Sequence, residues 1–291
     1  MTSQSQQNKR IVVAMSTSGL DYHPEAHGVR ILRLNIRTGA DTFIDGESMD
    51  CETFQRWLLS HPNELASTSP PSQLNLRKFF LGLMDEGYEE VLFIGMSSAL
   101  SKTCEHVRNI IPLLQNQMKI HVFDTRTGTF TEGLMALEAE KCFAKGWSMK
   151  KTLQHLEHLR VYQQVYFGVD NLTYLVNNGR LSRASGLLAN FLNIKPLIHV
   201  NRQGEAEVAE KIFSTNRVMQ AIADRINDLT YSDHYHVFTL YSGTSSAELH
   251  RSLQRVLAEQ CGLTDLPSYP ISPVVAAHIG PHAFGAGLFK I

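Results

Sequence analysis

The sequence predicts an α/β protein with two domains, each built around its own sheet. Three observations lead to this prediction. The chain has 291 residues, about twice the usual length of one domain. In its first half, short apolar strands alternate with amphipathic helices, which is typical of βαβ units and a mainly parallel sheet. In its second half, strands outnumber helices, which indicates a mixed sheet. We therefore predict an N-terminal α/β domain at residues 1–160 and a C-terminal mixed α/β domain at residues 161–291.

The elements of the N-terminal domain follow from the spacing of apolar residues. From Leu76 onward, apolar side chains recur at i, i+3, i+4, i+7 and i+8, which predicts an amphipathic helix over 73–86 that ends at Gly87. Short apolar runs without this period predict buried strands. The predicted strands are 10–16, 30–36, 91–95 and 120–124; further helices are predicted from about residue 101, over 130–145 and over 149–159.

The C-terminal domain is predicted in the same way. One helix over 245–261 places Leu249, Leu253 and Leu257 on a single apolar face. A second helix is predicted over 215–228. The predicted strands are 165–170, 195–200, 205–212, 236–241, 274–279 and 287–291. With six strands and two helices, this domain should contain a mixed sheet.

Composition excludes several classes of function. The 27 Lys and Arg and 28 Asp and Glu give a net charge of −1, without the basic excess that nucleic-acid binding requires. No apolar run approaches the roughly 20 residues of a membrane span. The four cysteines lie far apart without a C-x-x-C pair, which is typical of free thiols in a reducing cytoplasm and gives no zinc motif. We therefore predict a soluble, cytoplasmic protein with no nucleic-acid partner and no integral membrane segment.

Two loops place hydroxyl groups beside predicted elements. The first is 68–72 (TSPPS), whose two prolines stiffen the chain and hold it extended. The second is 97–103 (SSALSKT), between the strand at 91–95 and the following helix. Ligands of open α/β sheets bind outside the carboxyl ends of strands, where a helix N-terminus adds free N–H groups. These loops indicate a receptor for a carboxylate or phosphate, although helix capping is the more common role of Ser and Thr.

Two further motifs present side chains that can bind an anion. Gly179 follows Asn178 and tolerates a left-handed backbone, so it predicts a tight turn that projects Arg180. His278 ends an apolar run and could donate a hydrogen bond to a ligand or act as a general base. A solvated turn for Arg180 and a structural role for His278 remain the alternatives.

A serine esterase or thioesterase is an alternative function. Residues 95–99 (GMSSA) are close to the G-x-S-x-G nucleophile elbow. Ser97, then Asp124 or Asp170, then His278 would follow the chain order of α/β-hydrolases. However, an alanine replaces the second glycine and no HGGG-type segment precedes the motif. The neighbouring hydroxyls also suit the binding of an anion better than the activation of one oxygen.

Five motifs in order along the chain resemble those of the DegV family of bacterial fatty-acid-binding proteins, and together they span nearly the whole sequence. They are 68–72 (TSPPS) for T-S-Q-P-S, 97–103 (SSALSKT) for S-S-x-L-S-G-T, 172–175 with 178–182 (LTYL…NGRLS) for L-x-Y-L…G-G-R-I-S, 192–196 (LNIKP) for L-x-I-K-P, and 278–282 (HIGPH) for H-x-G-P-G.

This resemblance implies that one long-chain fatty acid is buried between the two domains. It implies no catalytic residue, no cofactor and no metal. The residues implied to bind the carboxylate are Thr68, Ser69, Ser97, Ser98 and His278, and those implied at the pocket mouth or at a partner contact are Arg180 and Ser16. In related systems a separate ATP-dependent fatty acid kinase converts the bound fatty acid to an acyl-phosphate for phospholipid synthesis. The chain itself has no G-x-x-x-x-G-K-[ST] or G-x-G-x-x-G nucleotide motif.

Four departures from the family motifs bear on the pocket and on partner recognition. Met15 stands where the family has the Asp of T-D-S-T, and Lys102 replaces the Gly of S-G-T. Asn178 replaces the first Gly of G-G-R, and His282 replaces the last Gly of H-x-G-P-G. We expect these departures to alter the pocket mouth and partner recognition more than the fold. They also leave open a sensor of another anionic small molecule.

Overall fold

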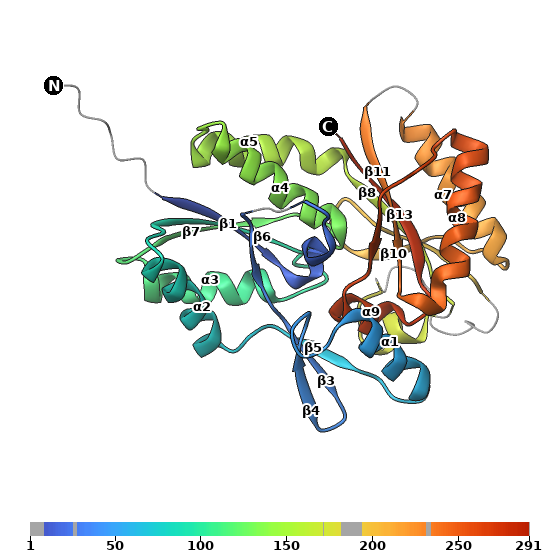
Figure 1. Cartoon of the computed structure of the whole chain (residues 1–291), viewed down its shortest axis with the longest axis horizontal. Helices are drawn as coiled ribbons and strands as arrows, with labels where there is room; N and C mark the ends of the chain where they lie inside the picture. The colour runs from blue at the N-terminus through green and yellow to red at the C-terminus, as the bar shows by residue number, and fades with distance from the viewer. Residues whose placement is uncertain (1–8, 26–27, 171, 182–193, 231–233, 291) are drawn as a thin grey trace.

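The computed structural model describes residues 9–25, 28–170, 172–181, 194–230 and 234–290. Within these ranges the strands form three sheets (Figure 1). The first lies in the N-terminal part of the chain and the second in the C-terminal part. A small third sheet lies below the junction between them in the view of Figure 1.

The N-terminal sheet has the strand order β2-β1-β6-β7, and every neighbouring pair is parallel. Helices cover it on both faces, α2 and α3 on one and α4 and α5 on the other (Figure 1). This explains why β1 and β6 are continuously apolar after their first residue, Arg10 or Glu90, rather than alternating. The bounds are β1 Arg10–Met15, β2 Arg30–Leu32, β6 Glu90–Gly95, β7 Lys119–Asp124, α2 Gln73–Asp85, α3 Thr103–Leu114, α4 Phe130–Ala144 and α5 Met149–Leu159.

The C-terminal sheet has the order β10-β9-β8-β13-β11-β12. Only β11 and β12 run parallel among its neighbouring pairs, so the predicted mixed sheet is confirmed. Helices α7 and α8 pack against its outer face (Figure 1). The bounds are β8 Gln164–Gly168, β9 Leu197–Val200, β10 Ala206–Glu210, β11 Tyr235–Tyr241, β12 Ser268–Pro270, β13 Phe284–Lys290, α7 Thr215–Thr230 and α8 Ala247–Cys261.

The third sheet, β4-β3-β5, is antiparallel and lies beside three shorter helices. Its strands contact α9, and α9 in turn contacts α1 and α6. Sequence reasoning did not find this sheet or helices α1 and α6, although Asp50 caps α1 by accepting a hydrogen bond from the backbone N of Thr53 (2.7 Å). The bounds are β3 Asn35–Thr38, β4 Asp41–Ile44, β5 Ser67–Ser69, α1 Cys51–Ser60, α6 Thr173–Asn177 and α9 Pro273–Ile279.

The single strand predicted over 30–36 is wrong, because the chain divides there between two sheets. Residues before Arg33 pair with β1, and residues after Leu34 pair with β4 and β5. At the division, the backbone N of Leu34 donates to Ser16 Oγ (3.2 Å) instead of joining a ladder. The Arg33 guanidinium pairs with the Asp21 carboxylate (2.7 Å). These two side-chain contacts redirect the backbone.

The strand predicted over 274–279 is also wrong, because this segment is helix α9. Every residue of α9 except His278 is buried. The segment is therefore apolar on nearly all sides, and its sequence shows neither the period of two of a half-buried strand nor the period of 3.6 of an amphipathic helix. Pro273 occupies the first turn, where a missing N–H costs nothing, and Gly280 follows the last turn. These two residues were the sequence signal for a helix.

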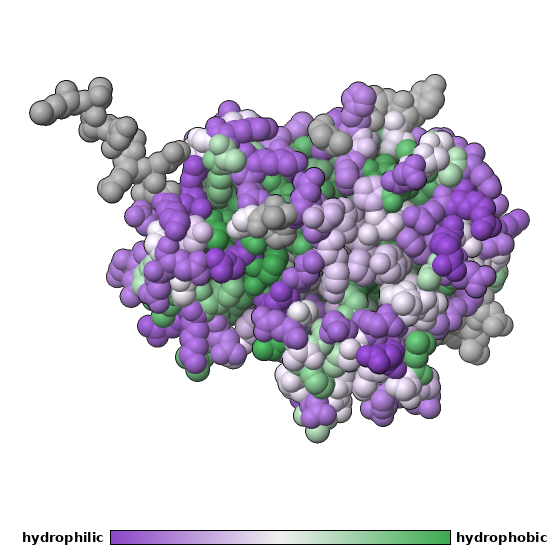
Figure 2. All heavy atoms as spheres, viewed as in Figure 1, coloured by the Kyte–Doolittle hydropathy of each residue, from purple (hydrophilic) through white to green (hydrophobic). Residues whose placement is uncertain are grey.

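Aromatic rings connect the two large sheets. Phe130, at the start of α4, stacks on Tyr269 of β12 with 3.6 Å between ring centroids and meets Phe238 of β11 edge-on. Phe130 is fully enclosed, with 1% of its surface exposed. On the face shown in Figure 2, hydrophilic residues predominate over the outer helices. Within the described part of the chain, no helix combines the length and the hydrophobicity needed to cross a bilayer.

Candidate functional site

A cavity lies between the carboxyl ends of the N-terminal parallel strands and the inner face of the C-terminal sheet. About 200 Å³ of it can be reached by the centre of a water molecule. The loops after β1, β6 and β7 form one wall, strands β8 to β11 form another, and α9 closes the side next to the third sheet. Most of the lining is apolar. The apolar side chains are Leu34, Met96, Leu100, Val165, Phe167, Leu175, Val200, Ala206, Leu240, Ile271, Val274, Val275 and Ile279.

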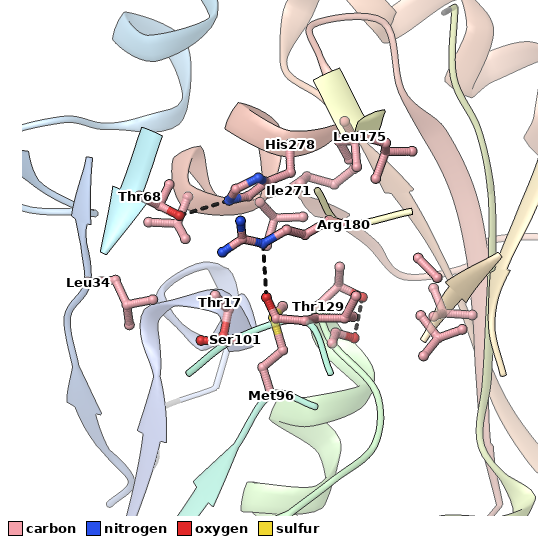
Figure 3. A pocket seen from close by; sticks show the side chains of 18 of the residues that line it. Thr17, Leu34, Thr68, Met96, Ser101, Thr129, Leu175, Arg180, Ile271 and His278 are labelled. Carbon is pink, nitrogen blue, oxygen red and sulfur yellow. Dashed lines mark hydrogen bonds between the residues drawn. The ribbon is translucent and has the colours of Figure 1, made fainter. Parts of the chain in front are cut away.

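Polar side chains gather at one end of this cavity. Thr68 of β5 and His278 of α9 are joined by a hydrogen bond of 2.8 Å between Oγ1 and Nε2. Arg180 follows α6 and extends beside this pair, where its Nε donates to the carbonyl of Leu100 (3.2 Å) (Figure 3). The predicted residues Thr68, Ser69, Arg180 and His278 all line the cavity, although they come from three separate parts of the chain.

Arg180 reaches this position through the end of α6. Gly179 adopts a left-handed backbone (φ 65°), as the sequence predicted. The backbone N of Arg180 then donates to the carbonyl of Leu175 (2.8 Å) and closes the helix end. The turn is therefore the C-cap of a helix that sequence reasoning missed. Ser182, the last residue of the motif, lies outside the described residues.

The imidazole of His278 is neutral in this environment. Burial, and then the charge of Arg180, lowers the pKa of His278 to about 3. Its Nδ1 atom is buried and has no hydrogen-bond partner among the described residues. Burial also lowers the pKa of Arg180 from its ordinary value, yet a guanidinium stays protonated at any physiological pH. The polar end therefore offers a hydroxyl, a neutral imidazole and one cation to a ligand.

Two helix N-termini face the same cavity. Ser101 and Lys102 precede α3, and Gly128 and Thr129 precede α4; all four line the cavity. Free N–H groups and the helix dipoles at such ends favour an anion. Thr129 has a positive φ (58°), which is rare for a β-branched residue. Backbone strain of this kind is often retained at ligand sites.

A buried carboxyl group lies behind the cavity wall. Thr17 lines the cavity, and its Oγ1 is 2.7 Å from Oε2 of Glu132 on α4. The backbone N of Met15 donates to the other oxygen, Oε1 (3.3 Å). Burial raises the pKa of Glu132 to about 8 despite these hydrogen bonds. Glu132 is therefore largely protonated at neutral pH and puts little negative charge near an anionic ligand.

The structure places Ser97, Ser98 and Ser16 outside the cavity lining. Ser97 is fully buried, and its Oγ accepts a hydrogen bond from the backbone N of Ala99 (3.2 Å). Gly204 packs so closely against Ser97 that a Cβ there would lie 2.1 Å from Ser97 Oγ. The backbone N of Ser98 donates to Asp124 (3.2 Å). Ser16 holds the backbone of Leu34, as described above.

The groups proposed for a hydrolase are not arranged as a triad. Nε2 of His278 bonds to Thr68, and its Nδ1 contacts no carboxylate among the described residues. Asp124 accepts hydrogen bonds from the backbone N atoms of Ser98 (3.2 Å) and Arg126 (2.9 Å). Ser97 Oγ is used within its own loop. This geometry supplies neither an oriented base nor an exposed nucleophile.

Sequence reasoning missed four polar side chains of the cavity lining: Thr17, Ser101, His106 and Thr129. Ser101 lay within a motif that was recognised, but only Ser97 and Ser98 were selected from it. Thr129 belongs to the loop 125–131 (TRTGTFT), which follows β7. The loop 97–103 was chosen because it is rich in hydroxyl groups and follows a predicted parallel strand. The loop 125–131 has the same two properties, so the sequence could have identified it as well.

Comparison with known proteins identifies the family. A family model described as "Uncharacterised protein, DegV family" matches residues 10–290.

The chain belongs to the DegV family.

The DegV domain-containing protein of Clostridium acetobutylicum is 26% identical over 284 residues, which cover 97% of this chain and 99% of that protein. Solved structures share the fold. A fatty acid binding DegV family protein from Streptococcus agalactiae matches with a TM-score of 0.88 at 24% identity, over 98% of this chain and 100% of that one. A protein from Eubacterium ventriosum described as stearic acid-binding matches with a TM-score of 0.83 at 20% identity, over 98% of each chain.

Two departures from the DegV motifs lie next to the cavity. Lys102 lines it directly and is exposed. Asn178 donates from Nδ2 to the carbonyl of Ala277 (3.0 Å), which connects the end of α6 to the helix that carries His278. A glycine at this position could not make that bond. The departure therefore adds a contact that helps to hold Arg180 and His278 together.

The other two departures lie farther from the polar end. Met15 is fully buried, and its Sδ accepts a hydrogen bond from the backbone N of Met96 (3.3 Å). An Asp there would place a carboxyl group in an apolar environment. His282 lines a separate surface hollow beside α1 and α6. It therefore affects the outside of the molecule rather than the cavity.

Proposed function

We propose that this chain binds one long-chain fatty acid in the cavity, with its carboxyl group at the polar end formed by Thr68, His278 and Arg180. The observation that carries the proposal is a mostly apolar cavity in which Thr68 and His278 are joined by a hydrogen bond and Arg180 lies beside them. An amphiphile with one anionic end matches this arrangement. The descriptions of solved DegV relatives as fatty-acid-binding proteins support the same ligand class.

The apolar lining accounts for affinity. Each buried CH₂ group contributes about 0.8 kcal/mol, so an acyl chain with about 14 of them gains roughly 11 kcal/mol before the cost of ordering it. The head group then needs oriented donors rather than a strong ion pair. Thr68 Oγ1 can donate to a carboxylate oxygen while it accepts a hydrogen bond from Nε2 of His278, and this arrangement assigns the proton of the imidazole to Nε2.

Ser69 lines the same end and is exposed, so it lies at the mouth in this proposal. Ser97 and Ser98 act through the loop instead of touching the ligand. The carbonyl of Ser97 accepts hydrogen bonds from the backbone N atoms of Leu100 and Ser101 (2.9 Å each), which holds these two residues against the cavity. Ser16 also acts indirectly in this proposal, because its Oγ accepts a hydrogen bond from the backbone N of Leu34, which lines the cavity.

We further propose that the bound fatty acid is presented in the cytoplasm to a separate ATP-dependent kinase, which forms the acyl-phosphate. The Arg180 guanidinium already donates to the carbonyls of Leu100 and Asn178, so a carboxylate held mainly by Thr68 keeps more of its nucleophilicity than one paired closely with a cation. Lys102 lines the cavity and is exposed, so it can meet the phosphates of a nucleotide carried by the partner. The chain then acts as a carrier, and the chemistry belongs to the kinase.

Mass spectrometry of the organic extract from denatured, purified protein tests the ligand. We expect one long-chain fatty acid in near-stoichiometric amount. An extract without lipid, from protein that also fails to take up added fatty acid, would overturn the proposal and favour a sensor of another anionic small molecule. The kinase step is tested separately, by mixing loaded protein with ATP and a fatty acid kinase and measuring acyl-phosphate.

A further inference from the structure

We propose that Glu138, Cys142 and His155 form a binding site for a zinc ion between helices α4 and α5. Glu138 and Cys142 are four residues apart on α4, so they lie on the same face of that helix. His155 lies on α5, which packs against α4. The site lies on the outer side of the N-terminal sheet, away from the proposed fatty-acid cavity, and does not depend on the proposed function.

The three ligand atoms are already close together. The carboxylate oxygen, the thiol sulfur and the imidazole nitrogen lie within 4.8 Å of one another. Oε1 of Glu138 and Nε2 of His155 are 2.9 Å apart. With bond lengths of about 2.0–2.3 Å, ligand atoms of a tetrahedral zinc ion are separated by roughly 3.3–3.8 Å. Small side-chain rotations therefore create the coordination geometry without a change in the backbone.

The donor set indicates which metal would bind. One sulfur, one nitrogen and one oxygen ligand suit a borderline cation such as Zn²⁺ rather than Mg²⁺ or Ca²⁺, which prefer oxygen alone. Three protein ligands leave a fourth position for water. Access for that water exists, because Glu138 and His155 expose 20% and 28% of their side chains while Cys142 is buried beneath them.

A second observation supports the site. The Thr152 hydroxyl on α5 is fully buried, and the Cys142 thiol, a weak hydrogen-bond acceptor, is the neighbour that it can contact. A buried hydroxyl normally has a partner. Metal binding would convert the Cys142 thiol to a thiolate, which accepts hydrogen bonds more strongly, so Thr152 becomes an outer-shell donor to the bound sulfur. A thiol that binds no metal gives this hydroxyl only a weak acceptor.

The charges of the proposed ligands and of the zinc ion balance, and basic side chains lie nearby. Lys145 and Lys151 lie near Cys142, and the ring of Trp147 meets the His155 ring edge-on. Glu138 and a Cys142 thiolate together carry two negative charges, which balance the two charges of Zn²⁺. The nearby lysines therefore face a neutral centre when the metal is bound.

Cobalt titration of the full-length, chelator-treated protein tests the proposal, because Co²⁺ bound to a thiolate gives a charge-transfer band in the near ultraviolet. We expect one equivalent of Co²⁺ to produce this band and Zn²⁺ to displace it. Cys142→Ser should abolish the band, whereas Cys261→Ser, which alters a half-buried thiol on α8, should leave it unchanged.

Two further variants separate metal binding from folding. His155→Gln and Thr152→Val both keep the thiol. Loss of an outer-shell partner typically costs 10–100-fold in affinity, so Thr152→Val should weaken Zn²⁺ binding by roughly 10-fold or more, and His155→Gln by at least as much. Circular dichroism checks that each variant is folded. No thiolate band in the wild type, or a band that persists in folded Cys142→Ser, would overturn the proposal.

Discussion

Replacement of Thr68 by valine removes one hydroxyl from the polar end of the cavity at nearly constant side-chain volume. Two interactions are lost at once. The first is the proposed hydrogen bond to the fatty-acid carboxylate, and the second is the bond of 2.8 Å to Nε2 of His278. A hydrogen bond to a charged group is worth about 1.5–3 kcal/mol. At about 1.4 kcal/mol for each factor of ten, fatty-acid affinity should fall by roughly 10- to 150-fold.

Competition between a fluorescent fatty acid and an unlabelled one measures the affinity of delipidated wild type and Thr68→Val. Thr42→Val is the matched control, because Thr42 is exposed on β4 of the same small sheet and does not line the cavity. It should bind as tightly as the wild type. If folded Thr68→Val also binds as the wild type does, the carboxyl group does not lie at Thr68 and the proposed orientation of the ligand is wrong.

Three more outcomes are expected. Val200→Phe adds volume inside the apolar lining and should shift the extracted lipid toward shorter chains, measured by mass spectrometry; an unchanged chain-length profile would place the acyl chain elsewhere. Burial raises the pKa of Glu132 from 4.5 to about 8, so the folded state holds an extra proton and loses stability as pH rises through this window. Glu132→Gln, which mimics the protonated group, should flatten the dependence of the unfolding free energy on pH, and an unaltered profile in urea titrations would contradict a neutral Glu132. Phe130→Ala removes a fully buried ring stacked on Tyr269 and should cost about 3–5 kcal/mol of unfolding free energy, which the same urea titrations measure. A loss below 1 kcal/mol would mean that this contact does not couple the two sheets.

Local sequence signals predicted most of the regular structure. The period of 3.6 placed α2 within one residue of its observed end, and apolar runs located β1, β6 and β7. These signals failed where packing overrode them. Residues 30–36 read as one strand, yet the contacts of Ser16 and Arg33 divide it. The run at 274–279 is buried on all sides, so its apolar pattern carried no information about its period.

The motifs also selected the correct family and fold class. Thr68, Arg180 and His278 were chosen from the sequence, and they meet in the structure although the first and last are separated by 210 residues. Ser97 and Ser98 were chosen by the same reasoning and do not line the cavity. A motif identifies which loop is used, but the direction of each side chain depends on the backbone of that loop and on what packs against it.

The sequence by itself thus determined most strands and helices of the two large sheets, the parallel arrangement of the first sheet and the membership of the DegV family, because these depend on local periodicity and on motif order. Only the tertiary structure decided which hydroxyls face the cavity, that Gly204 covers Ser97, and that His155 meets Cys142 across two helices. Such contacts join residues that lie far apart in the sequence, so local sequence patterns do not reveal them. They arise when the packed helices and sheets place particular side chains in the same volume, and the proposed function rests on those contacts.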